Sequence, residues 1–82
     1  MPRYWVYMLR CSDGTIYTGY TVDLEKRVAC HGSGKGSKYT RSRLPVELVY
    51  SEEAPSLRWA LKREAAIKKL SRRAKLLLSS RG

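Results

Sequence analysis

A carboxylate inside an apolar helical stripe is the first residue here that could do chemistry. Residues 56–70 have the spacing of a helix. Its apolar face consists of Leu57, Ala60, Leu61 and Ile67. At roughly 100° per residue, Glu64 falls about 20° from Leu57 and inside this arc. Burying a carboxylate there costs free energy unless it binds a metal or pairs with a cation. Glu64 is therefore either a metal ligand or the partner of an arginine in a buried ion pair.

A second helix carries a similar anomaly. In residues 24–31 the spacing i, i+3, i+4, i+7 places Leu24, Arg27, Val28 and His31 on one face. Arg27 and His31 either extend to solvent at the helix edge or face a cleft. In a cleft, a guanidinium matches the geometry of a phosphate group and can bind it through two hydrogen bonds.

Two tyrosines are placed by a short turn. Residues 4–11 and 15–21 are rich in aromatic and β-branched side chains, which predicts two strands, and the apolar residues on both faces of the first predict a central strand. The turn at residues 12–14 has three residues, and Gly14 suits its left-handed last position.

This turn length fixes which residues are opposite each other. It pairs Leu9 with Tyr17 and Tyr7 with Gly19. Because side chains alternate along a strand, Tyr7 and Tyr17 project from the same face. Gly19 leaves open space beside Tyr7 where a ligand could approach.

The remaining elements complete an α+β fold. We expect a three-stranded antiparallel sheet flanked by helices, in the order ββαβαα, as one domain covering residues 1–82. After the second strand, the expected elements are a helix capped by Asp23, a flexible basic loop at 32–43, a strand at 46–50, a helix at 56–70 and a last helix at 72–79 capped by Ser71.

The charge of the chain points to its partner. The 82 residues contain 17 Lys and Arg against 7 Asp and Glu, a net charge of +10. Such an excess favours nucleic acid phosphates or an anionic membrane. No apolar run is long enough to span a bilayer, and no signal peptide follows Met1, so we expect a cytoplasmic protein with Cys11 and Cys30 reduced.

Together the polar residues predict a cleft for metal-assisted phosphodiester cleavage, formed by Tyr7, Tyr17, Arg27, His31 and Glu64. A carboxylate can hold Mg²⁺ or Mn²⁺, which keeps most of its water and stabilises charge developing on phosphate. A tyrosine can act as general base if cations lower its pKa. The chain has one His, which excludes a His-rich zinc site. The basic loop supplies the candidate phosphate ligands Lys35, Lys38, Arg41 and Arg43.

The motif resembles the GIY-YIG nuclease superfamily. Trp5-Val6-Tyr7 stands where the family has Gly-Ile-Tyr, and Tyr17-Thr18-Gly19 stands where it has Tyr-Ile-Gly. The rest is similar to the small single-domain bacterial branch and to the nuclease domain of a eukaryotic structure-specific endonuclease acting on branched DNA. The resemblance implies that Arg27 is the catalytic arginine and Glu64 the metal ligand. It also implies that Tyr7 or Tyr17 activates water, that His31 assists, and that DNA is a more fitting substrate than RNA.

Several departures from the family pattern bear on mechanism. The chain contains no asparagine, which many larger relatives have late in the site. Tyr20 stands where some relatives carry a lysine, and Lys35 or Lys38 could substitute for it. We expect no extra DNA-binding domain, so that specificity comes from the basic loop, comes from a protein partner, or is low. A catalytically weak binding module, or an adaptor that needs a partner protein, is the alternative function.

Overall fold

The computed structural model describes residues 3–80, which form an α+β fold around a three-stranded antiparallel sheet. The strands are β1 (Tyr4–Arg10), β2 (Ile16–Thr21) and β3 (Glu47–Ala54), in the spatial order β2-β1-β3. β1 is therefore the central strand, as its apolar residues on both faces predicted. The predicted order ββαβαα is confirmed, with one short helix in addition.

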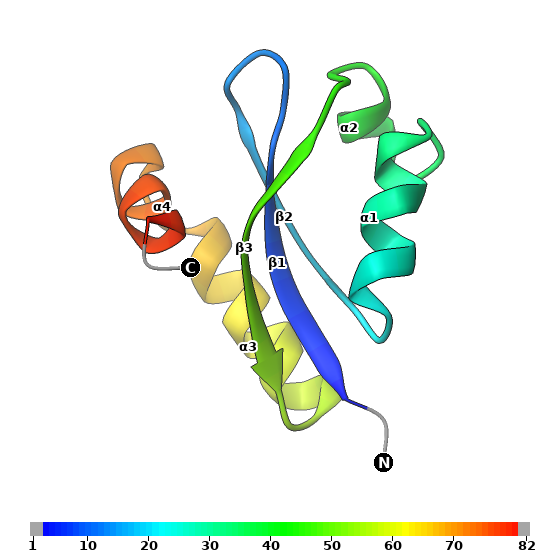
Figure 1. Ribbon diagram of the computed structural model, residues 1–82. Coiled ribbons are helices and arrows are strands. Elements are labelled where there is room, and N and C mark those ends of the chain that lie inside the picture. The colour runs from blue at the N-terminus through cyan, green and yellow to red at the C-terminus, as the bar shows by residue number, and fades with distance from the viewer. Residues whose placement is uncertain (1–2, 81–82) are drawn as a thin grey trace.

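The helices lie on both faces of the sheet. They are α1 (Leu24–Gly32), α2 (Lys38–Arg41), α3 (Leu57–Lys68) and α4 (Arg72–Ser79). In Figure 1, α1 and α2 lie on one side of the sheet and α3 and α4 on the other. Each helix follows a residue whose side-chain oxygen accepts a backbone N–H of the first turn, and these caps are Asp23, Ser37, Ser56 and Ser71. None of the helices described is long and apolar enough to cross a membrane.

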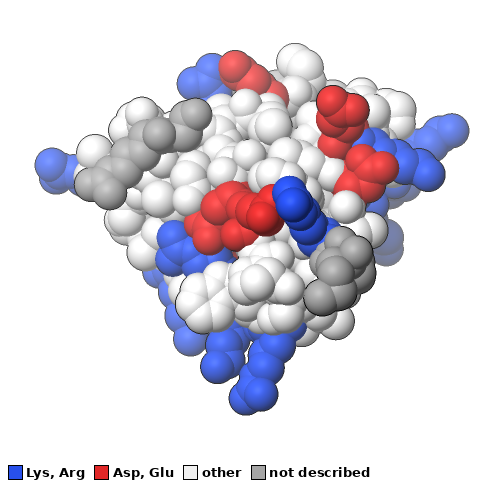
Figure 2. Space-filling view, turned by 60° about the horizontal axis from the view of Figure 1, so that its bottom comes forward, with Lys and Arg blue, Asp and Glu red and all other residues white. Residues whose placement is uncertain are grey.

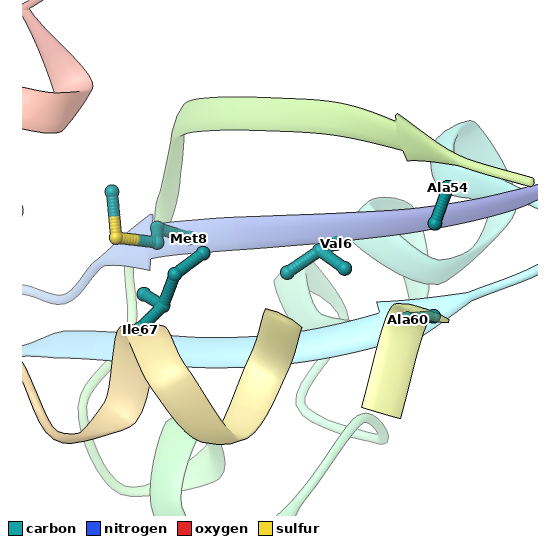
Figure 3. Close-up of a cluster of buried hydrophobic side chains, with 5 residues drawn as sticks. All are labelled: Val6, Met8, Ala54, Ala60 and Ile67. Atoms are coloured by element: carbon teal, nitrogen blue, oxygen red, sulfur yellow. The ribbon is translucent and has the colours of Figure 1, made fainter. Parts of the chain in front are cut away.

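The apolar core lies between the sheet and α3. Val6 and Met8 of β1 pack with Ala54 of β3 and with Ala60 and Ile67 of α3, all fully buried (Figure 3). Since successive side chains of a strand point to opposite faces, Tyr7 and Leu9 face the other layer, toward α1. The central strand thus supplies core residues to one face and a site residue to the other.

The predicted turn and register are confirmed. The N–H of Cys11 donates to the Thr15 carbonyl at 2.9 Å, and Gly14 has a positive φ of 84°. Tyr7 lies opposite Gly19, and Leu9 lies opposite Tyr17. The two tyrosines consequently share a face.

Two local predictions were wrong. The third strand continues to Ala54, well beyond residue 50. Ser51 and Glu52 continue the pairing with β1, opposite Tyr7 and Val6. The basic segment 32–43, predicted as a flexible loop, contains α2, which begins where the Ser37 hydroxyl accepts the N–H of Thr40. A side-chain cap and burial of Thr40 stabilise a single helical turn there.

The buried face of α3 also differs from the predicted one. Ala60 and Ile67 are fully buried, whereas Leu57 and Leu61 are 42% and 43% exposed. The helix is therefore rotated about its axis, so that Ala60 and Ile67 lie at the centre of the contact with the sheet. Glu64 lies about 40° from Ala60 around the helix, at the border of the buried face.

Candidate active site

A hollow of about 450 Å³ opens at the β2 edge of the sheet. Its walls are formed by Tyr7, Tyr17, Gly19, Tyr20, Thr21, Val22, Arg27 and Glu64. Four of the five residues predicted to be catalytic therefore line one space. They come from both layers, because Arg27 belongs to α1 and Glu64 to α3.

Gly19 creates the room in which the tyrosines lie. A Cβ at this position would be 2.7 Å from the Tyr7 hydroxyl oxygen and 2.9 Å from the carbon that bears it. It would also be 3.2 Å from the Tyr17 ring. The centroids of the two rings are 6.4 Å apart. A side chain at position 19 would thus displace the very hydroxyl that faces the hollow.

His31 lies behind Tyr7 and is fully buried. The Tyr7 hydroxyl is 2.8 Å from Nε2 of His31, and the Thr40 hydroxyl is 2.8 Å from Nδ1. The alternative in which His31 extends to solvent is therefore wrong. The imidazole does not line the hollow itself but reaches it through the tyrosine hydroxyl.

The protonation state of His31 follows from its surroundings. Burial, together with the nearby Arg27 charge, lowers the pKa of His31 below its usual 6.5. The ring is therefore neutral at neutral pH. The Thr40 hydroxyl can donate to the Ser37 hydroxyl oxygen at 3.0 Å or to the Ser37 carbonyl at 3.4 Å, and with either donation its oxygen accepts from Nδ1–H. In this tautomer, Nε2 accepts the proton of the Tyr7 hydroxyl.

Arg27 is half-buried and is oriented by the loop that follows α1. Its Nη2 donates to the carbonyl of Gly36 at 3.0 Å. Burial raises the pKa of Tyr7 above 10.0, and the Arg27 guanidinium partly offsets that rise. Gly36 also contacts His31, since a Cβ at position 36 would overlap Nδ1 of the imidazole. Gly36 therefore fits against both site residues of α1 because it has no side chain.

Glu64 points into the hollow with 17% of its side chain exposed. Its cation partner is Lys68, one helical turn later, with Nζ 3.7 Å from a carboxylate oxygen. No arginine within residues 3–80 pairs with Glu64, so among these residues the alternative of a buried ion pair with an arginine is wrong. Arg63, its neighbour on α3, instead binds both carboxylate oxygens of Glu52 at 2.9 Å.

The fit of the residues to a metal ion can be judged from these donors. Residues 3–80 contain no cluster of three or more His, Cys, Asp or Glu that could enclose a metal. Mg²⁺ keeps several waters and is commonly held by one or two carboxylates together with substrate phosphates. A single carboxylate in a hollow with room for water and phosphate fits such an ion, whereas it does not fit a structural zinc site.

The residues predicted to bind nucleic acid lie outside the hollow. Lys35, Lys38 and Arg41 are exposed. Arg43 is held more tightly, by an ion pair of 3.0 Å with Asp13 and by the Tyr39 ring, whose centroid is 3.9 Å from the guanidinium carbon. Figure 2 shows that charge is unevenly distributed, with acidic residues among uncharged ones on the face in view and most Lys and Arg side chains at its margins.

Two residues of the site escaped the sequence interpretation. Thr40 orients His31, and Gly36 accepts from Arg27, yet both lie in the segment that was predicted to be flexible. The signal that could have found them is Ser37, which precedes Thr40 by three residues as a helix cap does.

Comparisons with known proteins identify the family of this chain. The profile of the GIY-YIG catalytic domain matches residues 3–77. A UPF0213 protein of Syntrophus aciditrophicus is 58% identical over 79 residues, covering 95% of this chain and 91% of that protein. A UPF0213 protein of Staphylococcus saprophyticus is 49% identical over the whole of both chains.

Two solved structures of relatives are also similar to this chain. The solution NMR structure of a UPF0213 protein from Bacillus halodurans is 49% identical, covers 95% of this chain and 83% of that one, and superposes with a TM-score of 0.61. A protein of E. faecalis, also solved by NMR, is 42% identical, with coverage of 92% and 80% and a TM-score of 0.62.

Proposed function

Since the chain belongs to the GIY-YIG catalytic domain family, we propose that it is an endonuclease that hydrolyses nucleic acid phosphodiesters with one divalent cation. DNA is the proposed substrate in preference to RNA, and Mg²⁺ or Mn²⁺ the proposed ion. The observation that carries this proposal is the single hollow in which Tyr7, Tyr17, Arg27 and Glu64 meet. A module that only binds nucleic acid has no need of a half-buried carboxylate beside two tyrosines and an arginine.

Tyr7 is the better candidate for general base, although Tyr17 lines the same hollow. Its hydroxyl already has a proton acceptor in neutral His31, 2.8 Å away. In the proposed step, Nε2 takes the Tyr7 proton and the phenolate takes a proton from the water that attacks phosphorus. The P–O bond to the leaving sugar oxygen breaks, and that oxygen takes a proton from solvent. Because burial raises the pKa of Tyr7, the phenolate depends on Arg27 for compensating charge.

Arg27 has a second proposed role toward the substrate. Only one of its nitrogens donates to the Gly36 carbonyl, so the guanidinium keeps donors for a phosphate oxygen. Glu64 would hold the cation, which when bound stabilises the negative charge that develops on phosphate and leaving oxygen. Lys35, Lys38, Arg41 and Arg43 are proposed to attract and position the substrate from outside the hollow.

The proposed location is the cytoplasm, where the free thiols of Cys11 and Cys30 stay reduced. A protein partner remains a proposed source of specificity, because the chain presents a small site and a general excess of positive charge.

The test is a cleavage assay on single-stranded, duplex and branched DNA and on RNA, in Mg²⁺ or Mn²⁺. Wild type should cut at least one DNA form, and both Glu64→Ala and Tyr7→Phe should lose at least 100-fold in rate, the usual contribution of acid–base and electrostatic groups. Tyr4→Phe, a change of the same kind outside the hollow, serves as control. Wild-type binding without cleavage of any form would reject the nuclease in favour of a binding module.

A further inference from the structure

A basic groove continues from the candidate active site along the outer edge of β2. Two adjoining hollows of about 270 and 180 Å³ lie between β2, α2 and α4. We call them the β2 groove, which is lined by Ile16, Thr18, Tyr39, Lys68, Arg72 and Lys75. The larger hollow shares Tyr17 with the candidate active site, so the two spaces adjoin.

The charge of this groove has one sign. Lys68, Arg72 and Lys75 line it, and no acidic residue does. Lys68 lies at the junction, because its ammonium group is 3.7 Å from Glu64 in the neighbouring hollow. The Arg72 guanidinium donates to the carbonyl of Gly14, which fixes α4 against the hairpin. Lys75 makes no ion pair with any residue in 3–80 and touches both hollows.

The backbone of β2 adds a donor to the same groove. Since Cys11 N–H donates to the Thr15 carbonyl, the pairs that exchange hydrogen bonds alternate from there to Leu9–Tyr17 and Tyr7–Gly19. The N–H groups of Ile16 and Thr18 consequently point away from β1, but Thr18 is only 3% exposed, so Ile16 provides the donor that is open to the groove. β2 is an edge strand, and no other described segment donates a backbone hydrogen bond to it or accepts one from it.

From these observations we propose that the β2 groove binds the sugar–phosphate backbone of an unpaired nucleic acid strand as it leaves the cleavage site. Lys68 and Lys75 contact its phosphates, and the outward N–H group of Ile16 provides a further donor. A cationic groove that follows a backbone is how many proteins bind single strands without reading sequence. This proposal rests on the nuclease proposed above, because the groove opens from that site.

The groove binds the backbone and does not stack bases. Tyr39 and Tyr17 are its aromatic walls; their ring centroids are 5.9 Å apart, and the Tyr39 ring also contacts the Arg43 guanidinium at 3.9 Å. A ring held by these contacts keeps its place in the wall of the groove and is not available to stack on a base. The expected binding therefore has a strong salt dependence and little preference for particular bases.

The experiment is fluorescence anisotropy with labelled single-stranded DNA of about 20 nucleotides, in chelator, over a series of salt concentrations. Each phosphate contact on a single strand contributes about −0.7 to the slope of log affinity against log salt. Lys68→Gln with Lys75→Gln should therefore flatten the slope by about 1.4. The matched control is Lys62→Gln with Lys69→Gln, which removes the same charge from exposed positions outside the groove and should leave the slope unchanged.

Two further variants keep the test decisive. Lys75→Gln alone should flatten the slope by about 0.7, which covers the case where the double variant does not fold. Lys68→Arg with Lys75→Arg keeps the charge and should restore the wild-type slope. Arg72 is left intact, since its bond to Gly14 positions α4.

The outcomes separate this proposal from the nuclease assignment. If the salt slopes of single-strand binding are equal for wild type and the Lys68/Lys75 variant, the proposed binding to the β2 groove is wrong, even if the protein cleaves DNA. If the salt slope changes only for duplex DNA, the proposal that the groove binds an unpaired strand is wrong. An acidic peptide would also suit a cationic edge strand, so Lys75-dependent binding of polyglutamate with unchanged DNA slopes would overturn the proposal too. Lys75-dependent slopes without cleavage in Mn²⁺ would instead reject the nuclease and keep the groove.

Discussion

Replacing Glu64 by Gln should abolish cleavage and leave the fold nearly unchanged. The amide has the same shape as the carboxylate but cannot hold a divalent cation by charge. Nucleic acid binding should be intact or stronger, because a negative charge is removed from a hollow that receives phosphates. In this interpretation the carboxylate serves the metal and contributes little to stability.

The expected stability change can be worked from its contacts. Among the described residues Glu64 has a single ion pair, with Lys68, whose side chain is 55% exposed. Exposed pairs spaced i, i+4 on a helix contribute about 0.3–0.5 kcal/mol. In a domain of this size 1 kcal/mol shifts the melting temperature by about 4–8 °C, so the variant should melt no more than about 4 °C below wild type. Relief of the desolvation cost of the carboxylate acts in the opposite direction.

Glu52→Gln is the matched control on the neighbouring strand. Glu52 accepts from Arg63 at both carboxylate oxygens and from the Tyr50 hydroxyl at 2.7 Å. Hydrogen bonds to charged groups contribute about 1.5–3 kcal/mol, so this variant should melt lower by at least about 6 °C and keep its activity. The two substitutions thus separate a carboxylate used for chemistry from one used for structure.

The assay is thermal melting of wild type and both variants in chelator, beside cleavage in Mn²⁺. Loss of activity with a nearly unchanged melting temperature for Glu64→Gln would support the metal-ligand role. A large fall in melting temperature together with residual cleavage would refute it, because the carboxylate would then be a structural partner.

Three further predictions concern the basic loop, the glycine of the hollow and the buried histidine. Replacing Lys35 and Lys38 together by Gln should flatten the salt dependence of duplex binding by about two units if both contact phosphate, whereas an unchanged slope would place binding elsewhere. Gly19→Ala puts a Cβ 2.7 Å from the Tyr7 hydroxyl oxygen, so cleavage should fall sharply with a stability loss of about 1–3 kcal/mol; full activity would contradict this packing. The pKa of His31 is lowered from 6.5 by burial, so as pH falls below about 6.5 the unfolded chain takes up a proton that the folded chain refuses. The unfolding free energy from denaturant titrations should then decrease over that range until the folded pKa is reached, and His31→Gln should show a shallower decrease; parallel curves would mean that His31 is not the group responsible.

Local rules were enough to predict the pairing of the tyrosines. The turn of three residues and the alternation of side chains place Tyr7 and Tyr17 on one face without any tertiary information. The helix caps likewise predicted where most helices begin, since a cap depends on a few consecutive residues. The central position of β1 followed from apolar residues on both of its faces.

Contacts that depend on tertiary packing were not predictable in this way. A helical wheel gave an apolar face of Leu57, Ala60, Leu61 and Ile67, but the sheet packs on only two of these residues, Ala60 and Ile67, while Leu57 and Leu61 stay 42% and 43% exposed. The same rotation explains why Glu64 lies at the border of the buried face, where it reaches the hollow. The position of Glu64 was thus predicted from a stripe that is only partly buried.

The burial of His31 required the following segment to fold back over α1. Its Nδ1 is satisfied by Thr40, nine residues later, and no periodicity in the sequence relates the two. Glycine-rich composition suggested flexibility, whereas Gly36 has a packing role, because its missing side chain admits the imidazole. The amino-acid composition of such a segment indicates how flexible the chain is by itself. It does not reveal the tertiary contacts that order the segment in the folded protein.

The narrowness of the sheet explains why the candidate site lies at an edge. Arg27 comes from the helical layer on one face and Glu64 from the layer on the other, and a sheet separates the two layers everywhere except at its borders. At the β2 edge the two side chains line one hollow beside Gly19, where no side chain fills the space. An edge strand also exposes backbone donors, so a site built there is continuous with a surface that can hold an extended chain. The same geometry that brings the candidate catalytic residues together therefore supplies the path along which we expect the substrate strand to leave.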